Sequence, residues 1–100
     1  MNWLKRLLNG AIGSFKSDVN REIDRAIGKL QNGETVSMVV DALHATIADL
    51  LAKAKLPVPL GAILASVLMM ADWGNLTKMP VEQAIVELQR LRKQVEGARL

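Results

Sequence analysis

The chain has 100 residues, of which 50% are apolar and only three are aromatic, and it contains no cysteine. The lack of cysteine excludes disulfides, thiolate nucleophiles and the common zinc sites, and it fits the cytoplasm, where we expect the protein to act. The net charge of +3 comes without a basic stripe or a docking motif, which argues against a nucleic-acid partner. This composition predicts one helical domain over residues 1–100, an all-α bundle of four to five helices with an aliphatic core.

Residues 1–16 predict an amphipathic, basic helix. They contain three basic residues and no acidic one, and Lys5 and Arg6 lie opposite the apolar half of the helical wheel. A wide apolar face edged by tryptophan and basic residues is typical of helices at membrane interfaces, although the same face could pack on the bundle. The candidate contact face for an anionic membrane or a partner protein consists of Trp3, Leu4, Leu7, Leu8, Ile12 and Phe15, with Lys5 and Arg6 beside it.

The apolar pattern of this first helix continues beyond residue 16. Leu8, Val19 and Leu30 are eleven residues apart, a period of about 3.67 residues per turn that keeps a helix almost straight. We therefore favour one helix, continuous to residue 31 but with a bend, which Asn32 and Gly33 would terminate. The alternative is a second helix that begins at Ser17 or Asp18.

Residues 35–55 predict an amphipathic helix with Thr35 as its N-cap. The only histidine, His44, lies here, and Asp41 one turn earlier could orient its imidazole as in a general base pair. Neither a nucleophile nor a cluster of metal ligands accompanies this pair. We accordingly expect no enzyme activity, no metal and no cofactor.

Residues 56–73 are apolar on nearly every side, and they predict a buried helix over 59–73 as the fully apolar central helix of the bundle. The uncharged run is too short to span a bilayer, which needs about 20 apolar residues. Gly74 and Asn75 should terminate the helix. The adjacent Met69 and Met70 would either fill gaps in the core or form an adaptable binding surface.

Residues 80–98 predict a last amphipathic helix with Pro80 in its first turn. A short heptad seam runs along it at spacings of four and three residues: Ala84, Leu88, Leu91 and Val95. This candidate oligomer seam could pair with a second chain or dock on helices of its own chain.

These features predict a non-enzymatic helical module for protein–protein interaction or oligomerisation. Its partner would be another copy or another protein, in a larger assembly such as a phage particle or a regulatory complex. The alternative is a peripheral protein that binds anionic membranes through residues 1–16.

Overall fold

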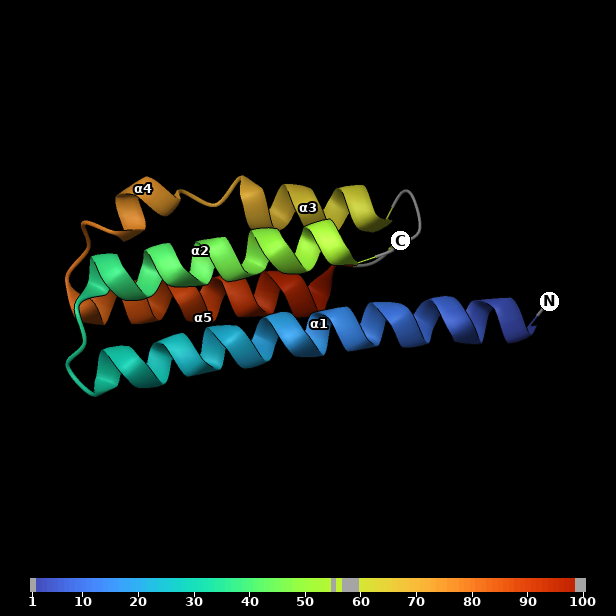
Figure 1. Ribbon diagram of the computed structural model, residues 1–100, viewed down its shortest axis with the longest axis horizontal. Helices are drawn as coiled ribbons and strands as arrows, with labels where there is room; N and C mark the ends of the chain where they lie inside the picture. The colour runs from blue at the N-terminus through green and yellow to red at the C-terminus, as the bar shows by residue number, and fades with distance from the viewer. Residues whose placement is uncertain (1, 55, 57–59, 99–100) are drawn as a thin grey trace.

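The computed structural model describes the backbone of residues 2–54, 56 and 60–98, and the side chains of these residues apart from 2–9 and 60. This part of the chain contains no strand and five helices, α1 (Asn2–Gln31), α2 (Val36–Lys53), α3 (Leu60–Met69), α4 (Trp73–Leu76) and α5 (Val81–Gly97) (Figure 1). The all-α bundle predicted from the sequence is therefore confirmed.

Helix α1 runs without interruption through Ser17 and Asp18. Its buried side chains recur every three or four residues, so they form one stripe that packs on α2 and α5. The stripe consists of Phe15, Val19, Ile23, Ala26, Ile27 and Leu30. Continuity is favoured because this stripe keeps the same face toward the core on both sides of Asp18.

The C-terminal end of α1 is closed by a Schellman motif. The amide of Glu34 donates to the carbonyl of Lys29, and the amide of Gly33 donates to the carbonyl of Leu30, both at 3.1 Å. Gly33 adopts a φ of 88°, a left-handed conformation that glycine accepts at little cost. The sequence signal for the helix end at Gly33 thus has a direct structural counterpart.

Helices α2 and α5 supply the rest of the core with their own apolar stripes. From α2 the buried side chains are Val39, Val40, Leu43 and Ile47, and from α5 they are Ala84, Leu88, Leu91 and Val95. Thr35 occupies the N-cap position of α2, but its side chain makes no capping hydrogen bond. Pro80 occupies the N-cap of α5, just before its first turn.

Helix α3 is not the enclosed central helix that its composition predicts. It packs on α5 and, less extensively, on α2, and among its described side chains only Leu64 and Leu68 are fully buried. Ile63 and Met69 remain 37% and 43% exposed. Most of the core is supplied instead by the longer amphipathic helices α1, α2 and α5. The apolar sequence of α3 therefore leaves part of its surface uncovered.

The single helix predicted over residues 59–73 is also not continuous in the structure. Residues 57–59 lie outside the described part of the chain, α3 ends at Met69, and Trp73 begins the short helix α4. Asp72 causes the division, since its carboxylate accepts a hydrogen bond from the Asn75 amide at 3.1 Å and caps α4. The break thus precedes Gly74 instead of following Trp73.

The N-terminal part of α1 projects beyond the ends of α2 and α5 (Figure 1). With 30 residues, α1 is about 45 Å long, against about 27 Å for the 18 residues of α2. Close to where α5 ends, the Lys16 ammonium donates to the carbonyls of Ala98 and Glu96 at 2.6 and 3.3 Å. We call residues 2–11, which lie beyond this point, the N-terminal arm.

Candidate functional site

The described surface contains a groove between α5 on one side and α3 and α4 on the other. Its volume is about 840 Å³, and its wall on α5 follows one helical face from Glu87 to Ala98. The lining residues are Ile63, Ser66, Val67, Met70, Ala71, Asp72, Asn75, Leu76, Met79, Glu87, Arg90, Leu91, Gln94, Gly97 and Ala98. We call this feature the α3–α5 groove.

The α3–α5 groove is apolar at its base and along its α3 rim. Leu76, Leu91 and Ala98 are buried at the base, whereas Met70 on the rim is 83% exposed. Methionine is unbranched and polarizable, so it adapts to differently shaped partners. The exposed Met70 and Ile63 are therefore suited to contact an apolar surface of a second molecule.

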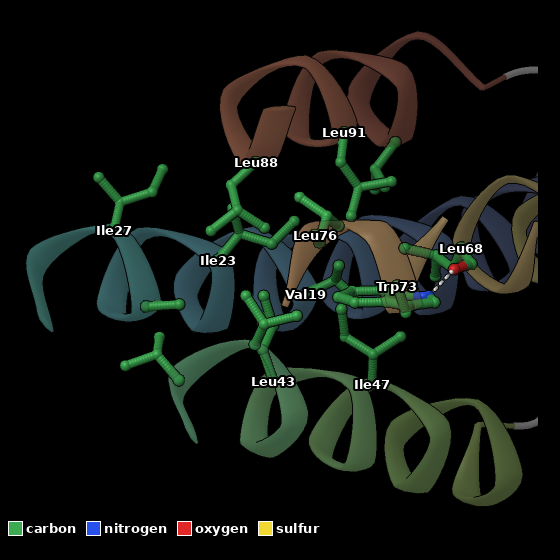
Figure 2. Close-up of a cluster of buried hydrophobic side chains, with 14 of the residues drawn as sticks. Val19, Ile23, Ile27, Leu43, Ile47, Leu68, Trp73, Leu76, Leu88 and Leu91 are labelled. Atoms are coloured by element: carbon green, nitrogen blue, oxygen red, sulfur yellow. Dashed lines mark hydrogen bonds between the residues drawn. The ribbon is translucent and has the colours of Figure 1, made fainter. Parts of the chain in front are cut away.

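Trp73 holds α4 against the end of α3, so it fixes the relative position of these two helices. Its buried indole donates to the Leu68 carbonyl at 2.8 Å, the bond drawn dashed in Figure 2. Leu68 and Leu76 point into the same interior as Trp73 in that view. Helix α3 ends at Met69, and the next two residues, Met70 and Ala71, line the groove.

Charged side chains stand at the polar edge of the groove. Arg90 pairs with Glu87 at 3.0 Å, and Asp72 caps α4 with one of its carboxylate oxygens. The charged residues that line the groove are thus two carboxylates, Asp72 and Glu87, and one guanidinium, Arg90, which leaves a small excess of negative charge. Surface pairs of this kind contribute little to stability, but they influence which partner approaches.

The candidate oligomer seam lies inside the chain's own core. Leu88, Ala84 and Val95 have no exposed surface and Leu91 has almost none. Their contacts are made with other helices of the same chain, which is one of the two arrangements that the heptad spacing allowed. A second chain could reach Ala84, Leu88 and Val95 only if the bundle opened, whereas Leu91 lines the base of the groove.

The candidate contact face of the N-terminal helix divides into two parts. Phe15 is buried in the core and Ile12 is half-buried at its edge. The other six residues belong to the N-terminal arm, and the structure describes their backbone but not their side chains: Trp3, Leu4, Lys5, Arg6, Leu7 and Leu8. The apolar pattern predicted as one contact face thus covers both a segment packed in the core and the N-terminal arm.

His44 is placed by packing. Its imidazole stacks on the indole of Trp73, with ring centroids 4.7 Å apart and an interplanar angle of 4°. The side-chain hydrogen bonds of the described residues do not include one between His44 and Asp41. The imidazole thus belongs to the packing around Trp73.

Two further properties concern the described residues as a set. They include no group of three or more His, Asp or Glu side chains arranged to hold a metal ion. None of their helices has both the length and the hydropathy that crossing a bilayer requires.

Sequence reasoning did not predict the α3–α5 groove as a site. The only signal for it was the Met69–Met70 pair, for which a binding surface was one of two interpretations. Comparison of the chain with models of protein families, with curated proteins and with solved structures gave no match.

Proposed function

We propose that the protein is a non-enzymatic interaction module that self-associates through the α3–α5 groove. The observation that carries this proposal is the apolar groove of about 840 Å³ with an exposed Met70 on its rim. An amphipathic helix that lays its apolar face into such a groove is a common mode of protein recognition.

The energetics favour an occupant with apolar side chains. Removal of apolar surface from water contributes about 25 cal/mol per Å², and both the base and the α3 rim of the groove offer such surface. The heptad seam of α5 cannot supply a separate contact, because Ala84, Leu88 and Val95 are fully buried in the core and Leu91 already belongs to the groove. The groove is accordingly the surface through which a small assembly component would join its neighbours.

The solution mass tests this proposal. We expect light scattering to give a mass above the 10.9 kDa of one chain, and Met70→Glu to lower it because a charge would be buried in the contact. The matched control is Met38→Glu, because Met38 is 72% exposed on α2 and does not line the groove. A wild-type mass of one chain at every concentration, or equal effects of the two substitutions, would contradict the proposal.

A second candidate function is binding to anionic membranes through the arm. Its support is the projection of α1 beyond the bundle (Figure 1) together with three basic residues and no acidic one in residues 1–16. Interfacial helices of this type insert their apolar face at the lipid boundary and place basic residues near the head groups.

Vesicle flotation tests this second function. We expect wild-type protein to float with anionic vesicles and to be released at high salt, since salt screens the attraction to head groups. Leu8→Glu should abolish flotation without loss of helical circular dichroism, because Leu8 lies in the arm. Protein that stays at the bottom of the gradient in every condition excludes the arm as a membrane anchor.

A further inference from the structure

We infer that the occupant of the α3–α5 groove is the N-terminal arm of a second copy, exchanged reciprocally in a two-fold dimer. This inference rests on the proposed function and names the segment that performs it. It follows from the spacing, length, charge and position of the arm.

The apolar residues of the arm have the spacing of a docking helix. Leu4, Leu7, Leu8 and Ala11 stand at positions i, i+3, i+4 and i+7, and α1 is helical over all of them. Residues at these intervals share one face of a helix, and this is the anchor pattern of helices that bind in grooves.

The lengths of the arm and the groove agree. Ten helical residues extend about 15 Å, and the α5 wall from Glu87 to Ala98 extends about 16 Å at the same rise per residue. The whole apolar face of the arm can therefore lie along the groove.

The charges are also complementary. The arm contains Lys5 and Arg6 and no acidic residue, whereas Asp72 and Glu87 outnumber Arg90 at the polar edge of the groove. Complementary charges of this size orient the arm more than they strengthen its binding.

The arm cannot occupy the groove of its own chain. It continues the straight path of α1 away from the bundle, and α1 and α3 lie on different sides of α2 and α5 (Figure 1). The groove has one end at Ala98, at the same end of the bundle from which the arm projects. Two copies that face each other with these ends can thus exchange arms, and a reciprocal contact closes the assembly as a dimer.

Disulfide trapping tests the contact directly, because the chain has no cysteine. An arm that enters at Ala98 brings its tip deepest into the groove, so Leu4 should approach Met70 of the other copy. We expect Leu4→Cys protein mixed with Met70→Cys protein to form a disulfide-linked heterodimer under mild oxidation. Leu4→Cys mixed with Met38→Cys is the control and should give none. A cross-link of equal yield in the control would overturn the inference.

Masses of the full-length variants separate this inference from the proposed function. We expect wild type to have twice the mass of one chain. Leu8→Glu and Met70→Glu should each be monomeric, with a loss of helical circular dichroism no larger than the ten residues of the arm contribute. If Met70→Glu lowers the mass and Leu8→Glu does not, another segment occupies the groove: the inference fails and the proposed function stands. If neither substitution lowers the mass, both fail.

Flotation gives the remaining outcome. Wild-type protein that is monomeric and floats with anionic vesicles until salt releases it would make the arm a lipid anchor, and it would overturn the exchange. Dimerisation that persists at high salt supports the exchange, because apolar contacts are not screened.

Discussion

Trp73 connects the start of α4 to the last turn of α3, the two helices on one side of the groove. Its indole is buried, stacks on His44 and donates to the Leu68 carbonyl at 2.8 Å near the end of α3. That carbonyl belongs to the last turn of a helix, where carbonyls need partners from outside the helix. Trp73 thus both fills the interior and closes α3.

Trp73→Phe should lower the free energy of unfolding by about 1–3 kcal/mol, because it leaves the Leu68 carbonyl without this donor. Chemical denaturation followed by circular dichroism measures the change. The control is Trp3→Phe, which lies in the arm beyond the core and should change stability by less than about 0.5 kcal/mol. Equal losses for the two substitutions would show that the hydrogen bond contributes nothing specific.

At the scale of the element, α1 combines a core helix and a projecting arm in one uninterrupted segment. Its buried stripe begins at Phe15 and ends at Leu30, and Gly33 then reverses the chain with a φ of 88°. Gly28, one turn before the end, has ordinary helical geometry and no atom within 4 Å of the place where a Cβ would stand. Gly33 is therefore required by its left-handed backbone conformation, whereas the position of Gly28 can accept a side chain.

Gly28→Ala should raise the free energy of unfolding by up to about 1 kcal/mol, since alanine loses less conformational entropy in a helix. Gly33→Ala should lower it by about 1–2 kcal/mol, because the left-handed conformation crowds a Cβ. Thermal and chemical denaturation of the two variants measures both effects. Changes of the same sign would contradict the conformational difference between these positions.

The sequence predicted most of this architecture, and the misses have physical causes. Periodic apolar stripes identified the helices around Val19, Leu43 and Leu88, because amphipathic spacing reports which face is buried. The prediction of one helix over residues 59–73 was wrong, because Asp72 caps a new helix through the Asn75 amide, a local signal that the uniformly apolar run obscured. The groove could not be read from composition, because it arises from the relative position of α3 and α5.

At the scale of the whole molecule, the local helical stability of α1 should decrease from its core segment to the N-terminal arm. The N-terminal arm projects beyond the ends of α2 and α5, with only Ala11 still beside the end of α2, and Gly10 and Gly13 each weaken a helix by about 1 kcal/mol relative to alanine. Short helices without tertiary packing are only marginally stable in water. The arm thus relies on a partner for its helical stability.

Hydrogen exchange can measure this gradient. In Met70→Glu protein we expect amides of residues 2–11 to exchange much faster than those of residues 19–30, which carry the buried stripe. In wild-type protein at dimer-forming concentration the arm should become protected. Uniform protection along α1 in the variant would mean that the arm is stable without a partner.

The contact between Lys16 and the end of α5 has a consequence for biosynthesis. Lys16 and Glu96 are 80 residues apart in the chain, which takes on the order of 4–16 s to synthesise at about 5–20 residues per second. Until α5 has been synthesised it cannot cover α1, so Phe15 and Val19 lack this part of their packing. The nascent chain should therefore be a substrate for chaperones that bind apolar segments, and the pairing of its first and last helices should be the slow, late step of folding.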